Sequence, residues 1–123
     1  MIVLLIAASL VIASISQIRD SVDVRQYLPR EESIRYHIAR GEYYTALDNI
    51  RELEACGVQL TGDMEEAAAV AYYYNAALLC KAYTETGDSE EAELQRNRMQ
   101  SFASAAGTLS EHLTKIDALL ENY

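Results

Sequence analysis

The N-terminal segment limits the fold of this chain more than any other feature. From Met1 to Ile18 no side chain is charged, and the polar side chains are three serines and one glutamine. As a helix, this run is about 27 Å long, slightly short of the ~30 Å hydrocarbon core of a bilayer. Because such a surface aggregates in water, residues 1–18 are predicted to contact a lipid bilayer or neighbouring hydrophobic helices as a transmembrane helix.

A cleaved signal peptide is the alternative for this segment, since such peptides also carry a short apolar core that ends at small residues. The basic residues that begin a signal peptide are missing here, which favours a retained helix. From Ile18 to Tyr27 the chain has no Gly or Pro, so the helix is expected to continue as a stalk until Pro29 interrupts it. We therefore assign residues 1–28 to one hydrophobic helix and stalk.

The side of the membrane is indicated by the arginines that follow the apolar run. Arg19, Arg25 and Arg30 lie shortly after it, and no basic residue precedes it. The excess of basic residues on the cytoplasmic side of membrane helices favours a single-pass protein with its C-terminal domain in the cytoplasm. Three arginines decide this weakly, and the opposite side stays open.

Residues 29–123 predict one all-α domain. The chain has one Pro and five Gly, too few to form the many turns of a β-sandwich or barrel. The formal net charge is −9, from 19 acidic and 10 basic residues, and no stretch gathers Lys or Arg into a basic face. We therefore expect no nucleic-acid partner, because the phosphate backbone is repelled on balance.

The glycines divide the domain into apolar-periodic stretches, each long enough for a helix. These stretches predict two antiparallel helical hairpins and a terminal helix, over residues 29–40 with 43–55, 63–86 with 89–106, and 109–122. The 63–86 stretch is apolar around too much of its circumference for a surface helix. It is predicted to be the central helix, covered on two sides.

Residues with capping chemistry mark three of the predicted helix starts. An oxygen-bearing side chain followed three residues later by an acidic one suits the positive end of a helix. Pairs of this kind are Asp63 and Glu66, Asp88 and Glu91, and Thr108 and Glu111.

The stretch AALLCKAYTETGDSEEAE resembles the tetratricopeptide repeat: Leu79, Cys80, Tyr83, Gly87 and Ala92 fall at that family's large, small, aromatic, turn and small positions. The earlier stretch SIRYHIARGEYYTALDNIREL resembles it more weakly, with Gly41 at the turn and Ala46 at the small position.

The resemblance covers about residues 34–99, and it implies helical hairpins that dock proteins. The turn glycines are 87 − 41 = 46 residues apart, against a family period of about 34. Two repeats are fewer than the ~3 that usually make a stable stack, so the 109–122 helix is expected to cap one end.

No motif for catalysis, a cofactor or a metal is found in the sequence. His37 and His112 stand in no metal-ligand spacing, and the paired glutamates all lie at predicted helix starts, where the helix dipole favours them. Phosphate-binding and nucleophile motifs are also missing. The sequence therefore predicts a protein that is not an enzyme, with no cofactor and no metal site.

The two cysteines, Cys56 and Cys80, have neither CxxC nor zinc spacing. Buried free thiols are the simpler interpretation. A disulfide between them is the alternative, if the domain faces an oxidising compartment.

Tyrosine is unusually frequent, with nine residues against one Phe and no Trp. The runs Tyr43–Tyr44 and Tyr72–Tyr73–Tyr74 cannot point into one core, because consecutive helix residues diverge by about 100°. At least one ring in each run is expected near the surface. Since Tyr is favoured in interfaces, the predicted partner-binding residues are Tyr43, Tyr44, Tyr72 and Tyr73; packing between helices explains the same residues equally well.

These features predict a non-catalytic protein–protein interaction module, a membrane-tethered adaptor or an accessory subunit of a membrane complex. The alternative is a pilin-like subunit of an extracellular filament, in which copies of the chain bury their N-terminal helices in a shared core. The segment lacks the acidic residue that many pilin-type helices carry near their start.

Overall fold

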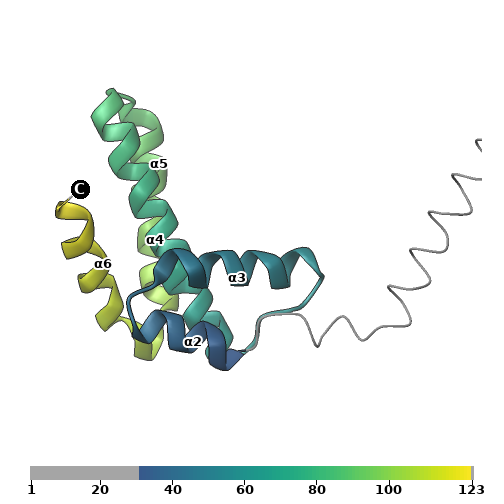
Figure 1. Ribbon diagram of the computed structural model, residues 1–123. Helices are drawn as coiled ribbons and strands as arrows, with labels where there is room; N and C mark the ends of the chain where they lie inside the picture. Colours follow the sequence, from purple (N-terminus) through teal and green to yellow (C-terminus); the bar gives the residue numbers. More distant parts are fainter. Residues whose placement is uncertain (1–30, 123) are drawn as a thin grey trace, which may run out of the picture.

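The computed structural model describes residues 31–122, and these residues are all-helical, with no strand among them (Figure 1). The all-α prediction is confirmed for this part of the chain. The elements are α2 (Glu31–Ala39), α3 (Tyr43–Ala55), α4 (Asp63–Thr86), α5 (Ser89–Ala105), the 3-10 helix η2 (Gly107–Leu109) and α6 (Glu111–Glu121).

The predicted hydrophobic helix and stalk over residues 1–28 lie outside the described residues. Between residues 31 and 122, no helix has the length and apolar character needed to cross a bilayer.

The observed helix boundaries agree closely with those predicted from the positions of the glycines. α3 and α4 begin and end at the predicted residues, and α2 and α5 each end one residue earlier than predicted. Gly87 ends α4 with φ of 81°, in the left-handed region, and its amide donates to the Thr84 carbonyl. A side chain at this position is strained whatever the space around it, which explains why Gly stands at the hairpin turn.

One of the three predicted caps is confirmed. The Asp88 carboxylate accepts a hydrogen bond of 3.2 Å from the Glu91 amide at the start of α5. The prediction for Asp63 was wrong, because Gly62 precedes α4 and the Asp63 carboxylate pairs instead with Arg35 of α2.

The predicted capping box of Thr108 and Glu111 was also wrong. The Thr108 hydroxyl donates to the carboxylate of Glu66 on α4, and the chain forms η2 before α6 starts at Glu111. In both failures a contact with a distant helix replaces the local cap.

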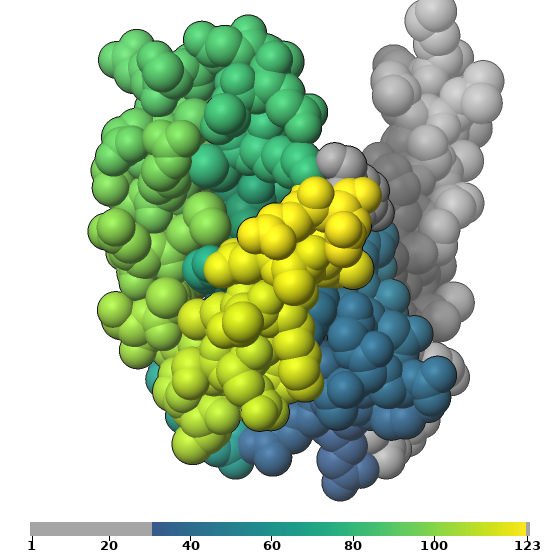
Figure 2. Space-filling view, turned by 90° about the vertical axis from the view of Figure 1, so that its left-hand side faces the viewer, coloured from purple at the N-terminus to yellow at the C-terminus, as the bar shows by residue number. Residues whose placement is uncertain are grey.

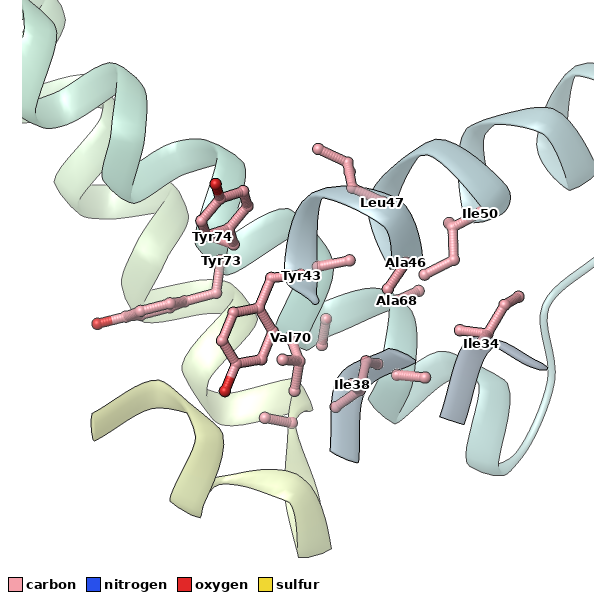
Figure 3. Close-up of a cluster of buried hydrophobic side chains, with 14 of the residues drawn as sticks. Ile34, Ile38, Tyr43, Ala46, Leu47, Ile50, Ala68, Val70, Tyr73 and Tyr74 are labelled. Atoms are coloured by element: carbon pink, nitrogen blue, oxygen red, sulfur yellow. The ribbon is translucent and has the colours of Figure 1, made fainter. Parts of the chain in front are cut away.

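α4 is the central helix, as predicted. Its N-terminal half lies among α2, α3, α5 and α6, and residues 67–71 are all buried (Figure 1). Large apolar side chains from four helices meet there, and each stabilises the fold by about 1.5–3 kcal/mol when fully buried. The largest fully buried side chains are Ile34, Ile38, Leu47, Ile50, Val70 and Ile116, and the first five of these are labelled in Figure 3.

The other end of α4 is covered mainly by α5, and the end of α6 reaches it at Lys81, whose ammonium group donates to the Leu120 carbonyl. We call residues 78–98, with the Gly87 turn at their tip, the hairpin end, and the remaining described residues the base. Within the hairpin end the buried residues are Ala92 and Gln95. Figure 1 shows this two-helix segment projecting beyond the other helices. Gln95 is 4% exposed, and its side-chain oxygen has no hydrogen-bond partner among the described residues.

Both cysteines are free thiols. Cys56 is exposed at the C-terminal end of α3, so its expected burial was wrong, while Cys80 is half-buried on α4.

Candidate partner-binding surface

Two of the predicted partner-binding tyrosines, Tyr43 and Tyr73, are buried and join other helices to α6. Figure 3 shows the two rings. The Tyr43 hydroxyl lies 3.0 Å from Nδ1 of His112, and the Tyr73 hydroxyl donates to the Asp117 carboxylate at 2.8 Å. Burial raises the pKa of Tyr43, and burial followed by the bond to Asp117 raises the pKa of Tyr73. Both hydroxyls therefore stay protonated and hold the domain together.

Tyr72 is half-buried and joins three helices. Its hydroxyl donates to the carboxylate of Glu54 on α3, and its ring stacks on Phe102 of α5 with 5.5 Å between ring centroids. Burial, then the hydrogen bond and negative charge of Glu54, raise the pKa of Tyr72 to about 12.

Tyr44 points away from the domain in the first turn of α3, with 67% of its surface exposed. The structure therefore does not gather the four tyrosines into one patch: Tyr44 is exposed, Tyr72 is half-buried, and Tyr43 and Tyr73 face inward. The expectation of a ring near the surface is met by Tyr44 in the first run, and Tyr72 is the least buried ring in the second. Their role in binding a partner stays a prediction.

The histidines make contacts within the domain. His112 is buried, and burial followed by the positive charge of Lys115 lowers its pKa. His37 lies with Nδ1 3.3 Å from the Glu42 carboxylate. Between residues 31 and 122, no group of three His, Cys, Asp or Glu side chains is arranged to hold a metal ion.

A first cavity, of about 340 Å³, lies where α2, α4, η2 and α6 meet. Its polar lining is engaged within the domain: Arg35 pairs with Asp63, and Thr108 donates to Glu66. The carboxylate of Glu66 also occupies the space that a Cβ at position 107 would need, so Gly107 permits this close approach. These polar contacts join α2 and η2 to α4 within the base.

A second cavity, of about 440 Å³, is an open groove between α6 and the α4–α5 hairpin. In the space-filling view α6 lies beside the hairpin, with a depression between them (Figure 2). The lining is mostly apolar, with charges added by Lys81 and two carboxylates. The groove residues are Ala77, Cys80, Lys81, Met99, Asp117, Leu120 and Glu121.

The sequence did not identify this groove, although one signal pointed toward it. The run Leu78–Leu79–Cys80 keeps α4 apolar on several faces at a place where α5 is largely polar. One neighbouring helix cannot cover so wide an apolar surface. The excess predicts a surface left partly open to solvent or to a partner.

No protein family, no curated protein and no solved structure matches this chain. The class of protein is therefore defined by the fold of the described residues. Residues 31–122 form an all-α domain of helical hairpins with a partly covered central helix and an open groove.

Proposed function

We propose that the protein is a non-catalytic protein–protein interaction module, acting as a membrane-tethered adaptor or accessory subunit of a membrane complex. The observation that carries this proposal is the hairpin end with its adjoining groove: an apolar helix surface that the rest of the domain leaves half-covered. Half-covered apolar surface on a folded domain is typical of a place where another protein packs.

The proposal includes a tetratricopeptide-like use of the two hairpins, α2–α3 and α4–α5. Support comes from the positions that the resemblance assigns. Ala46 and Ala92, at the two small positions, are 0% and 1% exposed. Gly41 and Gly87, at the two turn positions, have positive φ angles of 76° and 81°.

The anchor in this proposal is the uncharged run of residues 1–18, which suits a bilayer or a bundle of neighbouring hydrophobic helices. The arginines after it favour a cytoplasmic position for the domain. The domain is then held at the membrane, where tethering raises its effective concentration for partners in the same bilayer.

The test is gentle detergent extraction of the full chain, affinity capture, and sizing with mass spectrometry of the captured complex. We expect a different protein in fixed stoichiometry with this chain. A ladder or fibre built from this chain alone contradicts the adaptor and supports the pilin-like filament.

A pair of tyrosine variants tests the predicted contact residue in the same experiment. Tyr44→Ser removes the exposed ring, and we expect it to lower recovery of the partner. Tyr36→Ser is the matched control, because Tyr36 is also exposed, at 54%, but was not predicted to bind. Equal recovery with both variants removes Tyr44 from the binding surface.

A further inference from the structure

We propose that the groove between α6 and the α4–α5 hairpin binds one helix of a partner protein whose apolar stripe is flanked by lysine or arginine. This rests on the proposed function and specifies the chemistry of the partner. The occupant is inferred from the shape, the apolar floor and the charge of the groove.

The floor and walls come from three helices. Ala77 and Cys80 lie on α4, Met99 lies on α5, and Leu120 lies on α6. The Met99 side chain adapts to a partner's shape better than a branched one, because it is unbranched and its sulfur is polarizable. An apolar channel between helices suits the apolar face of an added helix.

The charge at the groove favours a cationic occupant. Asp117 and Glu121 contribute carboxylates, and the ammonium group of Lys81 donates to the backbone carbonyl of Leu120. The groove therefore adjoins the C-terminal end of α6, the negative end of the helix dipole. Lysine or arginine flanking an apolar stripe would meet these groups.

The hairpin end extends the same charge preference beyond the groove. From residue 82 to residue 95 the chain has no Lys or Arg, and its acidic residues there are Glu85, Asp88, Glu90, Glu91 and Glu93. A second copy of the chain would bring two such acidic ends together, and an anionic membrane would be repelled by them. A cation-flanked helix is attracted by both the groove and its surroundings.

The binding test uses the full chain in uncharged detergent micelles and labelled peptides of about 18 residues, long enough for ~27 Å of helix. The first probe carries leucines along one face and lysines beside them. The second replaces the lysines with glutamates, and the third scrambles the first, keeping its composition. Fluorescence anisotropy measures the affinity of each, and empty micelles give the background.

We expect the lysine peptide to bind at least about tenfold more tightly than either other peptide, with affinity falling as salt rises. Equal affinity for the lysine and glutamate peptides overturns the proposal, as does equal affinity for the scrambled peptide. Failure of the lysine peptide to bind above the micelle background overturns it as well.

Two variants localise the binding. Cys80→Arg fills the groove with a long cation, and we expect it to weaken binding of the lysine peptide at least about tenfold. Glu121→Lys reverses a charge at the rim, is exposed, and is expected to weaken binding about fivefold, as loss of a surface ion pair implies. Circular dichroism checks that both variants keep the helical fold.

The matched control is Glu90→Lys, which makes the same charge change at the acidic tip but outside the groove lining. We expect less than about twofold loss from it. A loss equal to that of Glu121→Lys means general charge attraction and overturns the proposal. Capture of a stoichiometric partner whose recovery is unchanged by Cys80→Arg and Glu121→Lys overturns the groove assignment while leaving the adaptor function standing.

Discussion

The base and the hairpin end share α4 and α5 but are stabilised very differently. In the base, α4 is surrounded by other helices, and its neighbours contribute fully buried side chains such as Ile34, Ile50 and Ile116. In the hairpin end, α4 packs mainly on α5 and meets α6 at Lys81, and burial falls to Ala92 and Gln95. A buried alanine contributes far less apolar area than a buried isoleucine.

Under the proposed function, this difference assigns stability to the base and partner binding to the hairpin end. The base contains enough buried apolar surface to hold the helices in place. The hairpin end leaves Leu78, Leu79 and Tyr83 half-buried, so it has apolar surface available for a partner. Binding surfaces are commonly drawn from the less stable part of a fold, because covering them supplies the missing burial.

The largest expected effect comes from shortening a buried side chain of the base. Ile50→Ala removes a side chain that is 0% exposed, and we expect the free energy of unfolding to fall by about 2–5 kcal/mol. The matched hairpin-end change is Leu94→Ala, at a side chain 44% exposed, with an expected loss within about 0.5 kcal/mol. Urea unfolding followed by circular dichroism measures both, and similar losses at the two sites would disprove the division.

Hydrogen exchange sharpens the same comparison without a mutation. Amides of the hairpin end, residues 79–86 and 89–96, are expected to exchange at least about tenfold faster than those of residues 67–74, a difference of about 1.4 kcal/mol in opening free energy. Few apolar contacts resist opening there, whereas the middle of α4 opens with the whole base. Uniform protection along α4 contradicts the expectation.

Helix ends were predictable from sequence because local chemistry sets most of them. Gly87 requires the left-handed conformation that ends α4, and Asp88 caps the helix that follows. The caps at Asp63 and Thr108 failed because Arg35 and Glu66, which lie far away in sequence, compete for the same side chains. Such contacts depend on how helices dock, which local patterns do not encode.

The candidate surface was predictable only in outline for the same reason. Helical geometry required the tyrosine runs to diverge, but which ring turns inward depends on where α6 lies. α6 gives Tyr43 and Tyr73 their partners His112 and Asp117, and Tyr44 has no such neighbour on its side. The groove likewise exists because α6 covers one part of α4 and stops, which no periodicity in the sequence reveals.

Gln95 allows a smaller test, inside the hairpin end. Its buried oxygen lacks a hydrogen-bond partner within residues 31–122, so Gln95→Leu removes an unsatisfied polar group and is expected to raise the free energy of unfolding by about 1 kcal/mol. Gln100→Leu is the control on the same helix, exposed and of similar helix propensity, with an expected change within about 0.5 kcal/mol. Destabilisation by Gln95→Leu would mean that the amide is bonded inside the hairpin.

The smallest expected effect is a pH dependence located in the base, at His112. Burial holds the pKa of His112 below the ordinary histidine value of about 6.5 in the folded state, so the unfolded chain binds the proton more readily. The stability due to neutral His112 is therefore present in full above pH 6.5 and is lost as pH falls through the lower folded-state pKa. The effect stays small because Nδ1 of a protonated ring can still donate to the Tyr43 hydroxyl, 3.0 Å away.

Urea unfolding at pH 7.5 and pH 5.5 measures this dependence. We expect the loss between the two pH values to shrink in His112→Gln and to persist in His37→Gln, the matched control at a histidine outside the contact between Tyr43 and α6. Comparing the pH difference within each variant removes any loss that the substitution itself causes, and the carboxylates that also titrate are common to both. An unchanged pH difference in His112→Gln would show that the ring is as easily protonated in the folded base as in the unfolded chain, and that water reaches a site which Tyr43 and α6 otherwise close.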